Sequence, residues 1–149
     1  MILYAARVIR QEEGRVLKVY RDTLGNLTVG VGHLIVPVDN IVVGDEITEG
    51  RCRELFRRDM ALAEAGARRL SWTLGSQPPE VLHVLTCMVF QLGHAGTRGF
   101  RKMMAALRRR DYAAAGAEML NSKWAKKDTP ARAERLAGVV AGLAHDGGS

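Results

Sequence analysis

The chain has 149 residues, enough for one globular domain or for two small lobes that share a linker. Apolar residues make up 47% of it and charged residues 26%, which excludes global disorder and permits a buried core. Its 22 Lys and Arg residues outnumber its 16 Asp and Glu residues and give a formal net charge of +6. Such a surface attracts polyanions such as nucleic acids, anionic lipids or a bacterial envelope, and charge alone does not choose among them.

The two cysteines, Cys52 and Cys87, lie far apart and show no CxxC or Cys/His spacing. Two buried free thiols are the favoured interpretation, and a single disulfide stays open. No apolar run approaches the length of a transmembrane helix. The apolar start MILYAA is interrupted by Arg7 and Arg10, and no secretory cleavage site follows it. These features predict a soluble protein made in the cytoplasm, which would need a separate route to any substrate outside the cell.

The N-terminal third predicts a helix followed by a β-hairpin. Residues 3–13 can form a helix with one apolar face, and Gly14 suits its C-cap. Two short β runs follow at 16–21 and 27–33. A continuous second strand would alternate two faces, with Leu27, Val29, Val31 and His33 on one and Thr28, Gly30 and Gly32 on the other. Glycine in such a strand indicates either the close approach of a ligand or backbone, or a bulge or tight bend.

The rest of the chain predicts mostly helix. An irregular link over 35–47 leads to Thr48, which begins a long and largely polar helix over 48–70, of a kind that can join two lobes. After a loop at 75–79, the almost wholly apolar residues 80–92 predict a central buried helix that Gly93 closes.

Four shorter features complete the C-terminal part. A glycine-rich loop is expected at 93–99, followed by helices from Phe100 to about Arg109 and from an Asp111 N-cap to Leu120. Thr129 and Pro130 form a good start for a last helix to about Leu143, and residues 145–149 are expected to fray. The predicted fold class is α+β, with a small N-terminal lobe at about 14–47, a connecting helix at about 48–70 and a helical lobe at about 71–149.

Two acids and a threonine meet at the predicted hairpin. Glu13 stands at its entrance, Asp22 in its turn and Thr28 on its return strand. A carboxyl group buried at a lobe junction can stay protonated and donate to a leaving oxygen, while a second, ionised carboxylate helps to activate water. Paired carboxylates of this kind suit glycoside hydrolysis. Each residue alone has an ordinary alternative: a solvated glutamate, an Asp that hydrogen-bonds its own turn, and a common strand threonine.

Other candidate sites carry less weight. His33 is interpreted as a structural histidine paired with an acid, on the face opposite Thr28. The four histidines, which also include His83, His94 and His145, lack metal-ligand spacing, so no metal site is expected. The sequence also lacks a GxSxG motif, a P-loop and a dinucleotide-binding GxGxxG unit. Met103, Met104 and Trp124 are interpreted as core or groove residues, and Arg108 to Arg110 as a solvated helix end.

The run EGRVLKVYRDTLGNLTVGVGH from Glu13 to His33 resembles the pattern EGxxxxxYxDTxGxxTxGxGH of the phage T4-type lysozymes, the endolysin family of glycoside hydrolases. MVFQLG at 88–93, Gly99 with Phe100, Trp124 and TPxRAxR at 129–135 are similar in order and rough spacing to the same family. The resemblance covers nearly the whole chain. It implies a two-lobed lysozyme fold, with the N-terminal helix 3–13 packed on the helical lobe and a cleft between the lobes.

The resemblance also implies a reaction. Family members cut the β-1,4 bond between N-acetylmuramic acid and N-acetylglucosamine in peptidoglycan, without a cofactor. By position, Glu13 is the general acid, Asp22 the second carboxylate and Thr28 the residue that holds the water. Such enzymes usually invert the anomeric centre, which predicts carboxylates roughly 6.5–9.5 Å apart.

Further positions follow from the same resemblance. Leu34 and Phe90 match residues that line the saccharide cleft, and Arg132 matches an arginine that pairs with the catalytic glutamate across the lobes. His33 and Asp59 match a structural ion pair. At two positions where a relative offers serine and asparagine to the sugar or its peptide, the chain has Met103 and Glu118.

The leading hypothesis is therefore a phage or prophage endolysin, a monomer that acts on peptidoglycan after release through a separate membrane hole. It predicts neither nucleic-acid binding nor stable membrane insertion. Two alternatives stay open: a lytic transglycosylase, which leaves an anhydro sugar, and a non-catalytic basic binder of wall polymer or nucleic acid. The presence of Asp22 and Thr28 argues against a transglycosylase. The presence of all three residues, Glu13, Asp22 and Thr28, argues against a non-catalytic binder.

Overall fold

The computed structural model describes residues 2–146 and divides into two compact units. Residues 3–62 form one unit, called the sheet unit below, and residues from 63 onward form most of the other, the helical unit. The boundary falls inside helix α2 (Glu49–Trp72). The lobe boundaries and the packing of the N-terminal helix, as expected from the sequence, stay predictions.

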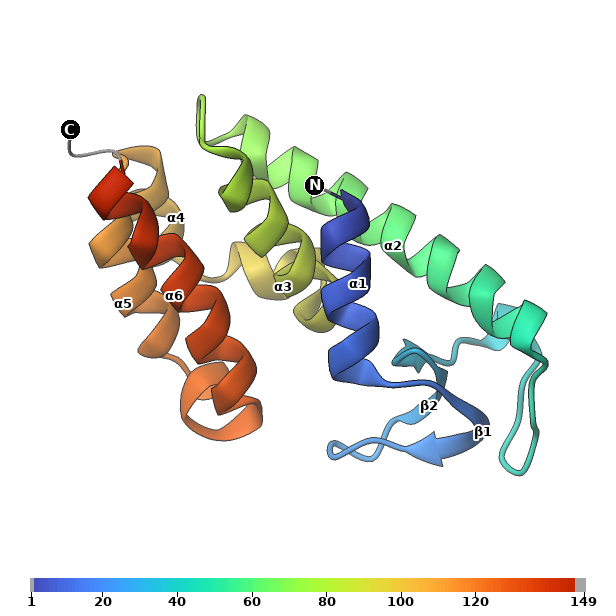
Figure 1. The fold of residues 1–149 in the computed structure, drawn as a ribbon. Helices are drawn as coiled ribbons and strands as arrows, with labels where there is room; N and C mark the ends of the chain where they lie inside the picture. Colours follow the sequence, from blue (N-terminus) through green and yellow to red (C-terminus); the bar gives the residue numbers. More distant parts are fainter. Residues whose placement is uncertain (1, 147–149) are drawn as a thin grey trace. The chain divides into compact units, whose positions relative to one another are not determined.

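The α+β class is confirmed, because the chain is mostly helical with one small antiparallel sheet (Figure 1). Helix α1 (Ile2–Glu13) leads into strands β1 (Val16–Arg21), β2 (Leu27–Gly30) and β3 (His33–Leu34). The strands follow in the order β1-β2-β3, and both neighbouring pairs are antiparallel.

The single strand predicted over 27–33 is wrong. It is two strands, β2 and β3, because the chain turns back between them at Gly30 and Gly32. These glycines have φ angles of 70° and 63°, in the left-handed region that glycine adopts without a Cβ clash. Of the alternatives that these glycines indicated, the tight bend is therefore the one that forms. His33 still faces away from Thr28, since it pairs with Val29 while Thr28 pairs with Leu34.

The link after the sheet is more ordered than the sequence suggested. Its first part forms the short 3-10 helix η1 (Pro37–Asp39). Its end pairs with β1: the Val19 N–H donates to the Asp45 carbonyl at 3.0 Å, and the Ile47 N–H donates to the Leu17 carbonyl at 2.8 Å. These bonds give β1 a second neighbour on its outer edge, which fixes the entrance to the hairpin.

The start of α2 agrees with the prediction at Thr48, whose hydroxyl accepts the Arg51 N–H at 3.0 Å. The first half of α2 buries an apolar stripe in the sheet unit, where Val29, Val31, Cys52, Leu55 and Phe56 are all buried. The Arg10 guanidinium carbon lies 5.0 Å from the centre of the Phe56 ring, so α1 and α2 also meet through a cation–π contact.

The helical unit contains the end of α2 and the helices α3 (Pro79–Arg98), α4 (Arg101–Arg108), α5 (Tyr112–Leu120) and α6 (Pro130–Asp146). Figure 1 shows α5 and α6 side by side, and these two helices share the most extensive helix–helix contact. Large buried side chains fill the interior: Leu85, Met88, Met103, Leu107, Met119, Leu136 and Val140. Burial of these side chains is the main favourable contribution to folding of this unit.

Two local predictions in this unit are wrong. Residues 94–98 are helical, where a loop was expected, and α3 continues through a kink at Gly93 with φ 79° and ψ 167°. The glycine ends one helical segment, as expected, but the residues after it have no proline and resume a helix. Helix α6 also passes the expected end at Leu143, so residues 145 and 146 are helical. The fraying expected for residues 147–149 lies outside the described residues.

Other local expectations are confirmed. Asp111 caps α5, because its carboxylate accepts the Ala114 N–H at 3.1 Å. Cys52 and Cys87 are both buried free thiols.

In the part of the chain that the structure describes, no helix combines the length and the apolar character needed to cross a membrane.

Candidate active site

Glu13 is the last residue of α1 and is half-buried. The helix ends there because Gly14 follows with a φ angle of 70° and donates its N–H to the Arg10 carbonyl at 3.0 Å. The Glu13 carboxyl group lies directly against Gly32: a Cβ atom at position 32 would stand 2.9 Å from the Glu13 carboxyl carbon. Gly32 therefore serves twice, since it allows the bend before β3 and leaves room for the acid.

Asp22 shapes the hairpin turn that it opens. Its Oδ1 accepts the backbone N–H groups of Leu24 at 2.9 Å and Asn26 at 2.8 Å, and its Oδ2 lies 3.4 Å from the Asn26 side-chain amide. The turn interpretation of this residue is thus realised in the structure. These bonds also fix the carboxylate in one orientation, which a catalytic carboxylate needs.

Thr28 is the most enclosed of the three predicted catalytic residues, with 4% of its surface exposed. Its hydroxyl donates to the Asn26 carbonyl at 3.0 Å, and the oxygen lone pairs remain available as acceptors. Its cross-strand partners are Tyr20 on β1 and Leu34 on β3. Directly paired residues share a face, so Tyr20, Thr28 and Leu34 form one row across the sheet.

Tyr20 is a site residue that the sequence analysis did not select, although the motif contained it. Burial raises the pKa of the Tyr20 hydroxyl above its usual value of 10.0, and the negative charges of Glu13 and Asp22 raise this pKa further. Both predicted catalytic carboxylates therefore act on the same phenol. The signal that could have identified it is its place in the motif, as a tyrosine between the two acids Glu13 and Asp22 in the sequence.

His33 has two acidic partners. Its Nδ1 lies 2.7 Å from Asp59 Oδ2, which is the contact that the resemblance implied, and its Nε2 lies 2.7 Å from Asp39 Oδ2. Asp39 also accepts the Val36 N–H at 2.9 Å, so it ties η1 to the sheet. The sequence analysis missed Asp39, because nothing in the pattern indicated that the link after the sheet folds back onto His33.

The pKa values in this cluster move in opposite directions. The hydrogen bond that His33 donates to Asp59 raises the pKa of His33 above its usual 6.5, burial opposes that shift, and the hydrogen bond to Asp39 adds to it. Burial acts to raise the pKa of Asp39, but the Val36 N–H and the His33 side chain outweigh it and lower this pKa below 3.8. Both shifts favour the charged forms, and the two short contacts of His33 link three segments of the sheet unit.

Two predicted site residues, Phe90 and Arg132, belong to the helical unit, and both are half-buried. The neighbour of Phe90, Gln91, accepts the Trp124 indole N–H at 3.0 Å and donates to the Thr129 hydroxyl at 2.9 Å. The pairing of Arg132 with Glu13 would join the two units, and it stays a prediction.

The segment before Arg132 contains a π turn that the sequence analysis missed. Element η2 (Trp124–Asp128) is a π-helix, closed by the Thr129 N–H bond to the Trp124 carbonyl at 2.9 Å. Single π turns are frequent at functional sites. With Gln91, this turn fixes the direction in which α6 starts, and hence the position of its first-turn residue Arg132.

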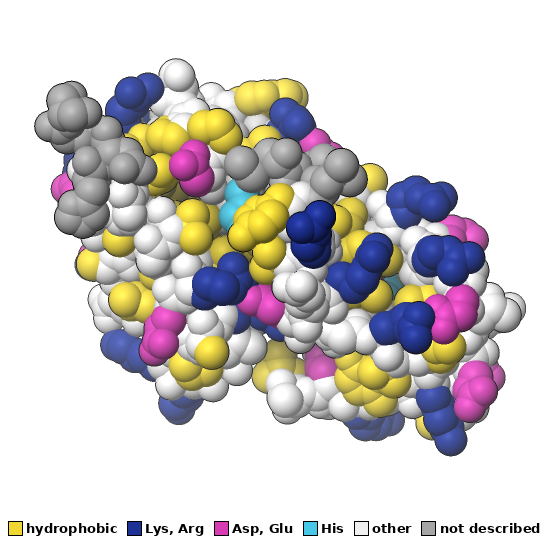
Figure 2. All heavy atoms as spheres, viewed as in Figure 1, with side chains coloured by type: hydrophobic (Ala, Val, Ile, Leu, Met, Phe, Trp, Pro, Cys, Tyr) yellow, Lys and Arg dark blue, Asp and Glu magenta, His cyan; other side chains and the backbone are white. Residues whose placement is uncertain are grey.

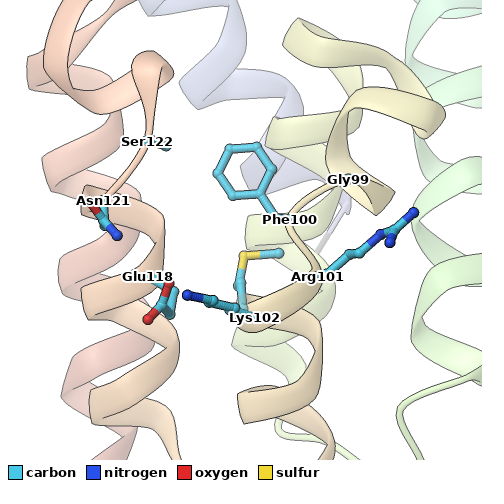
Figure 3. Close-up of a pocket in the computed structure, with 8 residues that line it drawn as sticks. Gly99, Phe100, Arg101, Lys102, Glu118, Asn121 and Ser122 are labelled. Atoms are coloured by element: carbon cyan, nitrogen blue, oxygen red, sulfur yellow. The ribbon is translucent and has the colours of Figure 1, made fainter.

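The helical unit also has a pocket of about 430 Å³ between the start of α4 and the end of α5. Met103 and Glu118, the two departures from the family pattern, both line it. Figure 3 shows the Lys102 side chain extending toward Glu118, while Arg101 points away. The lining combines an apolar part with charges of both signs: Gly99, Phe100, Arg101, Lys102, Met103, Glu118, Asn121 and Ser122.

The surface charge is mixed. Figure 2 shows Lys and Arg side chains spread over the visible face, with Asp and Glu side chains among them. Among the residues whose side chains are described, no group of three or more His, Cys, Asp or Glu could hold a metal ion; His145 is not among those residues.

The sheet unit thus holds a carboxyl group against a glycine, a second carboxylate fixed by its own turn, and a buried threonine. Comparison with known families identifies the class more closely. Residues 10–144 match the model of the phage lysozyme family, and the chain belongs to this family of lysozymes.

Individual relatives agree with this assignment. The chain is 28% identical to probable T4-type lysozyme 2 of Dictyostelium discoideum, over 89% of this chain and 90% of that protein. It is 30% identical to the endolysin of Salmonella phage P22, over 80% and 81% of the two chains. It is 33% identical to peptidoglycan hydrolase gp36 of Pseudomonas phage phiKMV, over 77% of this chain and 12% of that longer protein.

Proposed function

We propose that the protein is an endolysin that hydrolyses peptidoglycan at the β-1,4 bond between N-acetylmuramic acid and N-acetylglucosamine, with inversion of the anomeric centre. The observation that supports this most directly is the Glu13 carboxyl group against Gly32, in the same unit as the Asp22 carboxylate fixed by its turn and the buried Thr28. All four residues lie in the sheet unit. The family and the names of the endolysin and peptidoglycan hydrolase relatives support the substrate.

In the proposed reaction, Glu13 is protonated and gives its proton to the glycosidic oxygen as the bond to the anomeric carbon breaks. A water molecule attacks that carbon from the opposite side and loses a proton to Asp22. The leaving sugar departs as an alcohol, and the new hemiacetal carries the water oxygen. Glu13 ends ionised and Asp22 protonated, so one proton must be exchanged before the next turnover.

The hydrogen bonds of Asp22 suggest which oxygen is the base. Its Oδ1 accepts two backbone N–H groups, while the recorded contact of Oδ2 is the longer one to the Asn26 amide at 3.4 Å. Oδ2 is thus the better placed acceptor for the proton of water. The Thr28 hydroxyl, which already donates to the Asn26 carbonyl, can accept the other hydrogen of the same water and orient it.

Substrate contacts are proposed on both units. Leu34 lies in the same cross-strand row as Thr28 and is 53% exposed, so its side chain is available to a sugar ring. Phe90 is proposed to line the cleft in the helical unit, and Arg132 to pair with Glu13. Glu118 is proposed to contact the sugar or its stem peptide through the pocket in Figure 3, to whose wall the buried Met103 contributes.

The proposed setting is that of a monomer acting on the cell wall after release through a separate membrane hole. The net charge of +6 favours association with an anionic wall. Cations interspersed with anions, as on the face in Figure 2, offer no single basic stripe there for a nucleic-acid backbone. Neither nucleic-acid binding nor membrane insertion is part of the proposal.

The decisive experiment is digestion of purified peptidoglycan by the wild type and by Glu13→Gln, with mass analysis of the fragments. Glu12→Gln is the matched control, because it makes the same change at the adjacent position. Reducing muramic-acid ends from the wild type and the control, with none from Glu13→Gln, are expected. Anhydro ends would identify a lytic transglycosylase, and intact wall with all three proteins would contradict the hydrolase proposal.

A further inference from the structure

The pocket of the helical unit is lined by two opposite charges that do not pair with each other. Lys102 comes from α4 and Glu118 from α5, and Figure 3 shows Lys102 extending toward Glu118. Over the described part of the chain, neither side chain has an ion pair. A direct pair between two such accessible groups would add little stability, so both charges stay available to a ligand.

The other polar side chains of the lining are engaged within the chain or point away. The Asn121 Oδ1 accepts the Lys126 ammonium at 3.0 Å. The Ser122 hydroxyl donates to the Met119 carbonyl at 2.6 Å. The Arg101 side chain points out of the pocket in Figure 3. The two opposite charges are therefore the main polar groups that the lining offers to a ligand.

The two helix ends at the pocket carry partial charges of matching sign. The start of a helix is positive, because its first N–H groups have no partner inside the helix, and its end is negative. At the start of α4, Phe100 supplies no side-chain cap, and within the described chain the N–H groups of Lys102 and Met103 have no acceptor. Lys102 adds to this positive end, and Glu118, in the last turn of α5, adds to the negative one. The α4 side of the pocket therefore favours an anion and the α5 side a cation.

Apolar side chains form the rest of the wall. Met103 is 1% exposed, and Phe100 is half-buried with its ring edge-on to Trp124 at 5.8 Å between ring centres. The pocket volume of about 430 Å³ is within the usual range for small-molecule sites. A short aliphatic arm that ends in both an ammonium and a carboxylate group matches this combination of an apolar wall and two separated charges.

We propose that the pocket binds the zwitterionic end of a stem peptide, with its ammonium on Glu118, its carboxylate on Lys102 and the start of α4, and its aliphatic arm against Phe100. A diaminopimelate residue in a wall peptide carries such an end. A cross-link through the distal amine, or amidation of the distal carboxylate, removes one of the two charges. The protein should therefore prefer stems that are neither cross-linked nor amidated there. The choice of a wall peptide as ligand rests on the proposed function.

The binding test uses three soluble stem tetrapeptides and needs no catalysis. One has an intact diaminopimelate end, the second a carboxamide in place of the distal carboxylate, and the third an acetylated distal amine. NMR titration of the nitrogen-15-labelled wild type should show that the intact peptide binds about fivefold more tightly than either of the others. The amide signals that move should include those of residues 99–103. Equal affinity for the three peptides would overturn the proposal.

Two variants assign each charge of the ligand to its partner. Lys102→Met should weaken binding of the intact and acetylated peptides by about fivefold and leave the amidated peptide unaffected, because only that peptide lacks the carboxylate. Glu118→Gln should weaken binding of the intact and amidated peptides and leave the acetylated one unaffected. Equal losses for all three peptides in either variant would overturn the pairing. The amide spectra of the free variants check that the fold is retained.

Lys127→Met and Glu134→Gln are the matched controls, since they make the same changes at exposed positions outside the lining. Both should bind the three peptides as the wild type does. A preference that these controls also lose would assign it to net charge and overturn the proposal. A wild type that cuts peptidoglycan but binds the three peptides alike would contradict this inference alone. A wild type that distinguishes the peptides but cuts no wall would contradict only the proposed function.

Discussion

The sheet unit and the helical unit position their candidate functional residues in different ways. In the sheet unit the backbone determines the positions: Gly14 ends the helix under Glu13, Gly32 leaves room for its carboxyl group, and the turn holds Asp22. In the helical unit the pocket candidate Glu118 projects from a helix whose backbone does not depend on it. Under the proposed function, the chemistry lies on the first kind of support and recognition, which can vary, lies on the second.

The units also differ in what stabilises them. The helical unit depends on a large apolar interior, whereas the much smaller sheet is tied to α2 and η1 through one histidine between two carboxylates. Small units bury a smaller fraction of their surface, so a single polar cluster carries more of their stability. Changes in pH should therefore affect the two units unequally.

The largest expected effect separates the two roles of Asp22. Asp22→Asn keeps an oxygen that can accept the N–H groups of Leu24 and Asn26, so the turn should form, but the variant lacks a charged base. Activity on peptidoglycan is expected to fall by about 10²–10⁴-fold with little change in the unfolding midpoint. Asp22→Ala also removes the acceptor, so this variant should lose both the activity and the stability of the turn. Wild-type turnover in Asp22→Asn would show that this residue only shapes the turn.

The next prediction tests whether the backbone at Gly32 positions the acid. In Gly32→Ala the new Cβ would lie within contact distance of the Glu13 carboxyl group, which must then move. Displacement of about 1 Å can cost a factor of about 10² in rate. Gly44→Ala is the control, because Gly44 also has a positive φ angle but its added Cβ meets nothing within 4 Å. Equal activity in the two variants would contradict the geometric role.

The sequence predicted which candidate residues share the sheet unit better than it predicted the path of the chain there. Glu13, Asp22 and Thr28 do lie in one unit, because a motif fixes their spacing over a short stretch, and their catalytic roles stay predictions. The bend between β2 and β3 stayed one of two alternatives, since two glycines in a strand-like run fit a strand as well as a turn. The expected alternation still held for His33, which faces away from Thr28 because the register across the bend keeps the two residues on opposite faces.

Contacts between distant segments were the other limit. His33 with Asp59 was expected only from the resemblance, and Asp39 was not expected at all, because its place depends on the fold of the link after the sheet. In the helical unit, Gly93 was recognised as a break but not as a kink, since a glycine marks both in the same way. Local patterns predict elements, and tertiary packing decides how they continue.

The third prediction concerns the His33 cluster and pH. The pKa of His33 is raised, so its contribution to stability is complete below about 6.5 and is lost as the pH rises through the folded-state value. The pKa of Asp39 is lowered, so its contribution is present above about 3.8 and is lost as the pH falls through the folded-state value. The cluster should therefore stabilise the sheet unit most between about pH 4 and 6.5.

Chemical denaturation at several pH values checks this expectation. Asp39→Asn should lower the free energy of unfolding of the sheet unit by about 3 kcal/mol near pH 5.5, because it leaves a buried ion pair broken. The difference from the wild type should shrink at alkaline pH. Charges from other segments, Asp59 and Arg58 on α2, are unchanged in the variant. Asp45→Asn is the control, since Asp45 accepts a similar N–H bond but lies outside the cluster. A pH-independent difference would show that the bond to Val36 matters more than the charge.

The smallest expected effect tests the recognition side of the comparison. Glu118→Gln removes a charge from the pocket without changing its shape, and a partly exposed ionic contact is worth at most about 1 kcal/mol. KM on peptidoglycan with intact stem peptides should therefore change by no more than about fivefold, with kcat unchanged and the effect weaker at high salt. On glycan strands stripped of peptides, Glu118→Gln should leave KM unchanged if the pocket contacts the stem peptide. It should change KM by the same factor as before if the pocket contacts the sugar. Glu134→Gln, at an exposed position on α6, is the control for net charge alone. A fall in kcat for Glu118→Gln would place chemistry in the helical unit and break the division of roles between the two units.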